Sequence, residues 1–173
     1  MSMSSNGELT LEWWGSGSVP APASIVWCNF PEHLSPGVPG PKPRPALILK
    51  VRYATQPPDG RFYVQTVYGT SKLKIGRRPN DFTISNFATL NVLRLPQATR
   101  FDLDNVLWLP WARPYFNGRK PDDRYSTPTM SVLPAALQQS LRWTMARREQ
   151  LGLEAADKGA ASEPEKPKAP GKK

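Results

Sequence analysis

Cysteine and histidine are almost absent from this sequence, which holds one of each, Cys28 and His33. A single cysteine forms no intrachain disulfide, and one Cys with one His cannot supply the nitrogen and sulfur ligands of a zinc site. Cys28 stands in the apolar run SIVWCNF. This setting favours a small buried hydrophobe over a reactive thiol. We therefore expect a protein without disulfides, bound metal or other cofactor.

Long apolar runs and glycine-rich phosphate-binding motifs are missing too. No stretch of about 18 apolar residues is present to span a membrane. The N-terminal MSMSSNGELT lacks the basic and apolar parts of a signal peptide. We therefore expect a cytoplasmic protein with no membrane partner. The absence of Walker-type and dinucleotide-binding fingerprints argues against P-loop NTPases and Rossmann dehydrogenases.

Proline and positive charge are abundant. The 20 prolines argue against a protein of long helices, because each removes a backbone donor and obstructs the preceding helical turn. Short strands joined by proline-bearing loops fit this composition better. Lys and Arg outnumber Asp and Glu by 23 to 14, a net charge of +9. This excess indicates an anionic partner, such as a nucleic acid, an acidic protein or a lipid surface.

The composition divides the chain into three parts. Residues 1–23 are rich in Ser, Gly and Pro and predict a flexible arm. Within it, Trp13 and Trp14 either dock on the domain or serve as a partner-binding anchor. Residues 24–150 hold the pattern of a folded domain. Residues 151–173 are of low complexity, without aromatic or β-branched side chains, and predict a disordered tail.

The apolar pattern of the middle part predicts a mainly β fold with a C-terminal helix. Leu137, Leu141 and Met145 recur every four residues and predict a helix over about 134–150, with Arg142, Arg147 and Arg148 near its end. Several short strands separated by turn signals are typical of a small barrel. The expected strands cover residues 24–30, 46–53, 61–68 and 106–111, with two more in 81–87 and 90–95.

Two segments are suited to holding an anion. A proline-stiffened loop delivers Arg44 to the start of the strand at 46–53, and an Arg there can present its donors to a phosphate. After the third strand, Gly69 is followed by Thr70, Ser71 and Lys72, which offer two hydroxyls and an ammonium. If both strand ends lie at one rim, they form a compact anion site. Otherwise Arg44 caps a strand and the second segment is an ordinary turn.

Two pairs of carboxylates are the remaining candidates for acid–base or metal chemistry. Asp102 and Asp104 are spaced like alternate residues of a strand, and Asp122 and Asp123 lie in the charged stretch NGRKPDDR. We interpret both pairs as solvated turn residues rather than as a catalytic or metal site.

The order strand, Pro/Gly-rich loop, RPALIL, turn, strand, TSK resembles the MazF/PemK family of bacterial toxins. The resemblance is firm over residues 24–72 and looser through TRFDLDNVLWLPW to VLPAAL. It implies an SH3-like, strongly twisted small β-barrel that forms a homodimer. It also implies a metal-independent endoribonuclease that cleaves single-stranded RNA by 2′-hydroxyl attack and is paired with a cognate antitoxin protein.

The resemblance also assigns roles to residues. Arg44 would stabilise the phosphate oxygens, and Thr70 or Ser71 would hold the scissile phosphate. Many relatives carry Glu-Gln shortly before this Arg, whereas here the loop SPGVPGPKPR has no acid. Glu32 and His33, at the start of the loop, are the nearest groups able to move a proton.

Basic and aromatic residues fit a single-stranded RNA groove. Those expected to bind RNA are Lys42, Tyr68, Lys72, Lys74, Arg77 and Arg78.

Two alternatives remain open. One is a catalytically inactive barrel of the same type that binds nucleic acid or an acidic protein. The other is an inhibitor of a DNA-processing enzyme, in which the Trp13–Trp14 arm or the C-terminal helix makes the contact.

Overall fold

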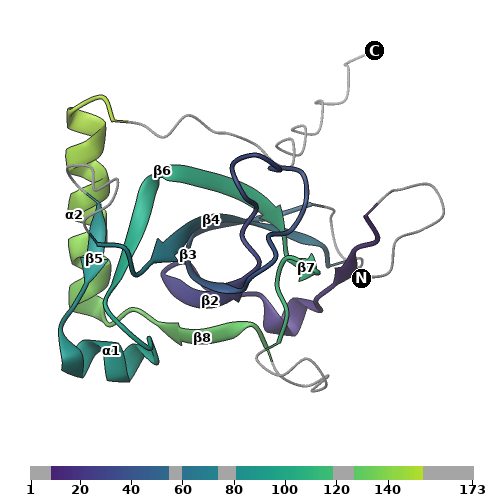
Figure 1. The fold of residues 1–173 in the computed structure, drawn as a ribbon, viewed down its shortest axis with the longest axis horizontal. Coiled ribbons are helices and arrows are strands. Elements are labelled where there is room, and N and C mark those ends of the chain that lie inside the picture. Colours follow the sequence, from purple (N-terminus) through teal and green to yellow (C-terminus); the bar gives the residue numbers. More distant parts are fainter. Residues whose placement is uncertain (1–8, 55–59, 74–80, 119–126, 154–173) are drawn as a thin grey trace, which may run out of the picture.

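A curled antiparallel sheet of six strands forms a half-barrel at the centre of the molecule (Figure 1). The computed structural model describes residues 9–54, 60–73, 81–118 and 127–153. The strand order is β5-β6-β4-β3-β2-β8, so the prediction of a mainly β fold is confirmed. The strands are β2 (Ser24–Cys28), β3 (Arg44–Tyr53), β4 (Phe62–Thr70), β5 (Phe82–Ile84), β6 (Thr99–Pro110) and β8 (Thr129–Val132).

The central strands are buried on both faces of the sheet. In β3, Leu47 belongs to one apolar cluster and Ile48 to another, and both side chains are fully buried. Successive side chains of a strand point to opposite faces, so a continuous apolar run covers both. β3 and β4 pair as an antiparallel hairpin, from Tyr53 opposite Phe62 to Ala46 opposite Tyr68. The buried strand and the hairpin that the sequence predicts are therefore confirmed.

The C-terminal helix α2 (Ala135–Gln150) lies along one side of the sheet (Figure 1). It begins directly after Pro134, whose missing amide hydrogen is not needed at a helix start. Leu141 is buried and Leu137 partly buried against the sheet, whereas Met145 is 37% exposed. The predicted helix is confirmed. No described helix is both long and apolar enough to cross a membrane.

The prediction of a strand over residues 90–95 is wrong, because this segment belongs to helix α1 (Phe87–Leu93). The Asn86 side chain accepts a hydrogen bond of 3.1 Å from the Thr89 amide and so caps the helix start. Leu90 and Leu93, three residues apart, are the buried side chains, which is a helical spacing. Arg94 then ends the helix in the left-handed conformation, with a φ of 57°.

The end of the N-terminal arm is docked on the sheet. Strand β1 (Glu12–Trp13) pairs with β7 (Ala112–Arg113), and a 3-10 turn (Ser16–Ser18) follows. The Trp14 indole donates a 2.8 Å hydrogen bond to the Phe116 carbonyl, and the Trp13 ring lies 5.6 Å from that of Tyr63. Of the two roles considered for these tryptophans, docking is the one observed.

Candidate functional site

The start of β3 and the end of β4 lie side by side, because the two strands are antiparallel neighbours. Arg44 is the first residue of β3 and Thr70 is the last of β4. The register, in which Ala46 faces Tyr68, therefore brings both segments to one rim, which is the condition stated above for a compact anion site.

The loop before Arg44 is held at both of its ends. The Asn29 side chain donates to the Gly40 carbonyl at 3.0 Å, and the Gly40 amide donates back to the Asn29 carbonyl at 2.9 Å. A Cβ on Gly40 would lie 2.2 Å from the Phe30 carbonyl oxygen, so only glycine fits this crossing. The Tyr115 hydroxyl adds a 3.1 Å hydrogen bond to the Gly37 carbonyl. These contacts fix the path by which the loop returns to Arg44.

The end of β4 is shaped by a glycine and a threonine. A Cβ on Gly69 would lie 2.9 Å from the Pro45 carbonyl oxygen and 2.7 Å from the Thr99 side chain. Glycine thus permits a close approach of β4 to β3. The buried Thr70 hydroxyl accepts a 3.1 Å hydrogen bond from the Lys72 amide. This local bond turns the chain so that Lys72 follows Thr70 onto the same rim.

These elements enclose a pocket of about 720 Å³. Four residues singled out in the sequence for chemistry or RNA binding line it from β3, β4 and the following turn, and Glu32 and His33 line it from the loop. Sequence reasoning missed the other five lining residues. The pocket lining consists of Phe30, Pro31, Glu32, His33, Pro36, Arg44, Tyr68, Thr70, Lys72, Asn105 and Leu107.

The remaining predicted site residues lie elsewhere. Ser71 and Lys42 are exposed and are not among the lining residues of the pocket. Lys74, Arg77 and Arg78 fall outside the described residues.

Tyr68 combines an aromatic face with a neutral hydroxyl. Its ring lies 5.3 Å from that of Phe30, centroid to centroid. Burial raises the pKa of the Tyr68 phenol, and the Asp102 carboxylate raises it further, whereas the cations Arg100 and Arg44 oppose these effects. The phenol is therefore protonated at neutral pH and can donate a hydrogen bond into the pocket.

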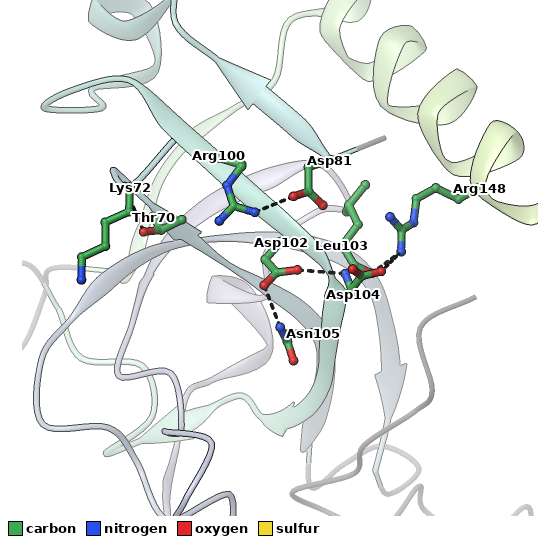
Figure 2. A network of polar contacts seen from close by, with 9 residues as sticks. All are labelled: Thr70, Lys72, Asp81, Arg100, Asp102, Leu103, Asp104, Asn105 and Arg148. Carbon is green, nitrogen blue, oxygen red and sulfur yellow. Dashed lines mark hydrogen bonds and ion pairs between the residues drawn. The ribbon is translucent and has the colours of Figure 1, made fainter. Parts of the chain in front are cut away.

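A buried ion pair supports the strand behind Thr70. Arg100 lies opposite Thr70 in the β4–β6 register and contacts Asp81 at 2.5 Å. The side chains are only 4% and 3% exposed, respectively. Figure 2 shows this pair beside Thr70. The pair links the residue just before β5 to β6, and a buried ion pair of this kind adds little net stability.

Strand β6 carries a long, irregular bulge at residues 102–105, next to the pocket. Val67 pairs with Val106 and Gly69 with Phe101, so the single residue Tyr68 faces residues 102–105. The prediction that Asp102 and Asp104 are solvated turn residues is therefore wrong, because both lie within β6 and are hydrogen-bonded. Bulges of this kind re-aim side chains beside functional sites. Asp122 and Asp123 fall outside the described residues.

Asp102 organises this bulge, as Figure 2 shows. Its carboxylate accepts a 3.1 Å hydrogen bond from the Asp104 amide and a 2.7 Å hydrogen bond from the Asn105 side-chain nitrogen. On the opposite side, the buried Arg148 of α2 forms an ion pair with Asp104 and donates to the Leu103 carbonyl at 3.2 Å. The bulge thus directs Asn105 to the pocket and Asp104 to the helix.

The pocket is chemically suited to an anion attached to a ring. Arg44 and Lys72 supply two positive charges, Thr70 a hydroxyl, and Tyr68 with Phe30 an aromatic wall. Within the described ranges, no three His, Cys, Asp or Glu side chains gather in a way that could hold a metal ion. A comparison with protein-family models found no match, and neither did a search of curated proteins.

Proposed function

We propose that this protein is a metal-independent endoribonuclease of the MazF/PemK type, which cleaves single-stranded RNA in the pocket at the rim formed by the start of β3 and the end of β4. The observation that carries the proposal is the convergence of Arg44, Thr70 and Lys72 with His33 around one pocket of about 720 Å³. The resemblance to this family assigns roles to Arg44 and Thr70, whereas Lys72 and His33 are added here by their charge and chemistry. The curled sheet with its C-terminal helix is compatible with the SH3-like barrel of that family.

The chemistry is an internal transesterification. The 2′-oxygen attacks the adjacent phosphorus, the bond to the 5′-oxygen breaks, and the products are a 2′,3′-cyclic phosphate and a 5′-hydroxyl. Negative charge builds up on the phosphorane oxygens, where the Arg44 guanidinium stabilises it. The Thr70 hydroxyl donates to a phosphate oxygen, and Lys72 adds positive potential.

Two protons must move in this reaction. One leaves the 2′-hydroxyl and another reaches the departing 5′-oxygen. Glu32 and His33 both line the pocket from the loop, so side chains able to take up a proton border it together with Thr70. We assign His33 to accept the 2′-hydroxyl proton and to return a proton to the departing 5′-oxygen, because an imidazole can both accept and donate a proton. Glu32 is the second candidate.

The biological setting follows from the same proposal. A toxin of this type acts in the cytoplasm as a homodimer and is held inactive by a cognate antitoxin protein. The net charge of +9 fits both RNA and an acidic antitoxin segment.

The first test is incubation of purified protein with a long single-stranded RNA in EDTA. The wild type should yield discrete fragments that end in cyclic phosphate. Arg44→Ala should slow cleavage at least a hundredfold, the cost typical of losing one donor to a developing oxyanion, while RNA affinity falls only modestly. Arg147→Ala removes an equal charge from the exposed face of α2 and should cleave normally.

Intact RNA after incubation with folded wild-type protein would contradict the enzymatic proposal. Binding without cleavage would instead favour the catalytically inactive barrel. That alternative gains weight from the loop before Arg44, which lacks an acidic residue in positions 34–43.

A further inference from the structure

Asn105 differs in chemistry from the cationic residues of the pocket. Arg44 and Lys72 carry only hydrogen-bond donors, which suit the phosphates of a nucleic acid strand. Asn105 is neutral and reaches the pocket from the β6 bulge, which faces Tyr68. It therefore borders the aromatic part of the pocket, where a base rather than a phosphate would lie.

The orientation of the Asn105 amide follows from its partner. An ionised carboxylate only accepts hydrogen bonds, so the amide nitrogen must face Asp102, and the distance between these atoms is 2.7 Å. The Asn105 oxygen consequently points away from Asp102, as Figure 2 shows. Asp102 is itself held by the Asp104 amide at 3.1 Å, so it cannot easily turn to release the Asn105 nitrogen.

The Asn105 oxygen, fixed in this way, favours a nucleic acid group that donates a hydrogen bond. Phosphate oxygens only accept hydrogen bonds, so the Asn105 oxygen is not suited to the strand's phosphates. Cytosine carries an amino group at the position where uracil carries a carbonyl oxygen. A carbonyl facing the Asn105 oxygen would leave two acceptors opposed and both unsatisfied, which costs binding energy.

We propose that Asn105, held by Asp102, accepts a hydrogen bond from the exocyclic amino group of a base in the pocket, and so selects an amino base against uracil. This inference rests on the proposed function in one respect, namely that a nucleic acid strand enters the pocket. Asn105 is the residue that contacts the base, and Asp102 is the positioning residue that sets the polarity of the contact.

The pairing makes a specific prediction for Asp102→Asn. The new side chain keeps an oxygen for the Asp104 amide and turns its own amino group toward Asn105. Asn105 then gains by rotating its oxygen toward residue 102, which leaves its amino group facing the pocket. The preferred base should change from one with an amino group to one with a carbonyl oxygen.

The test compares binding of 2′-O-methyl hexanucleotides of cytosine and of uracil at fixed ionic strength. These strands cannot be cleaved and have no 2′-hydroxyl donor, so a difference between them arises from the base. The wild type should bind the cytosine strand about fivefold more tightly, the value of one net hydrogen bond. Asn105→Leu should bind both strands equally, and Asp102→Asn should prefer uracil.

Asn117→Leu is the matched control, because the Asn117 side chain donates to the Pro114 carbonyl and is not among the pocket residues. It should keep the preference for cytosine. Asn105→Ser is the second variant, should the leucine disturb folding as judged by circular dichroism. A serine hydroxyl both donates and accepts, so this variant should also bind both strands equally.

Three results would overturn the inference: equal or tighter binding of uracil by the wild type, a cytosine preference that survives in Asn105→Leu and Asn105→Ser, or no binding of either strand. The outcome is distinct from that of the cleavage test. Discrimination between the strands without cleavage of ordinary RNA would support the base contact and reject the ribonuclease. Cleavage without discrimination would support the ribonuclease and reject the base contact.

Discussion

Gly69 is a position at the pocket rim where a side chain larger than hydrogen does not fit. A Cβ at this position would lie within 3.1 Å of atoms from Thr99, Pro45 and Phe101, which belong to strands on both sides of β4. The residue next to it, Thr70, presents its hydroxyl only if β4 keeps this close approach.

Gly69→Ala should therefore lower the free energy of unfolding by about 1 to 3 kcal/mol, the usual cost of overpacking. It should also reduce RNA cleavage by displacing Thr70. Urea unfolding and a cleavage assay would measure the two effects. Gly17→Ala is the control, since nothing lies within 4 Å of a Cβ there. Equal stability of both variants would contradict the argument.

Cys28 is fully buried in β2, as the sequence predicts, and burial raises the pKa of its thiol well above the ordinary value of 9.0. The unfolded chain therefore loses this proton first as the pH rises. The contribution of the thiol to stability is complete well below the ordinary pKa of 9.0 and is lost as the pH rises through that value toward the pKa of the folded state. Burial also raises the pKa of Tyr68 and Tyr115, with the same sign at higher pH.

We expect the free energy of unfolding to fall between pH 8.5 and 10 with a slope of up to about 1.4 kcal/mol per pH unit from Cys28. Cys28→Ala should lower stability at every pH but make this slope shallower. Urea unfolding at several pH values measures both. A slope that is unchanged in Cys28→Ala would show that the thiol does not ionise in this way.

At the scale of elements, a buried arginine links α2 to the sheet in addition to the apolar residues Leu137 and Leu141. The Arg148 side chain is 4% exposed and reaches the β6 bulge, where it pairs with Asp104. It also donates to the Leu153 carbonyl just beyond the helix, at 3.0 Å. The same bulge carries Asn105, so the helix end and the pocket share one structural support.

Arg148→Ala should destabilise the protein by about 2 kcal/mol, because Asp104 and two carbonyl groups lose a charged donor. Arg147→Ala, one residue earlier and exposed, should change stability by no more than about 0.5 kcal/mol. Thermal and urea unfolding of the two variants provide the comparison. Similar losses in both would mean that the ion pair does not hold the helix.

Helix α1 shows why the type of a short element is hard to predict. LNVLRL has the β-branched and apolar residues of a strand, yet Asn86 caps a helix and Leu90 and Leu93 share one buried face. The pattern over six residues fits both structures. Helix α1 also packs against β8, a strand more than thirty residues later in the chain, and this contact cannot be read from the local pattern.

At the scale of the whole molecule, the excess of positive charge should govern binding to RNA. The net charge is +9, and Arg44 and Lys72 line the pocket. Each phosphate contact releases counterions, so affinity falls with salt. Lys72→Gln should reduce the slope of log affinity against log salt by about 0.7, the value for one contact to a single strand. Arg147→Gln, with the same loss of charge, should leave the slope unchanged.

Fluorescence titration of a labelled RNA at several salt concentrations would provide these slopes. A Lys72→Gln slope equal to that of the wild type would place Lys72 outside the phosphate contacts.

The sequence by itself determined the mainly β character, the buried strand β3, the β3–β4 hairpin and the helix after Pro134. These features depend on local periodicity, turns and caps. It also pointed to Arg44 and Thr70 as rim residues, because the start and end of a hairpin necessarily meet. Only the tertiary structure decided the rest: the pairing of Arg148 with Asp104, 44 residues apart, and the bulge that turns Asn105 to the pocket. Such contacts depend on the register between strands distant in the chain, which no local pattern specifies.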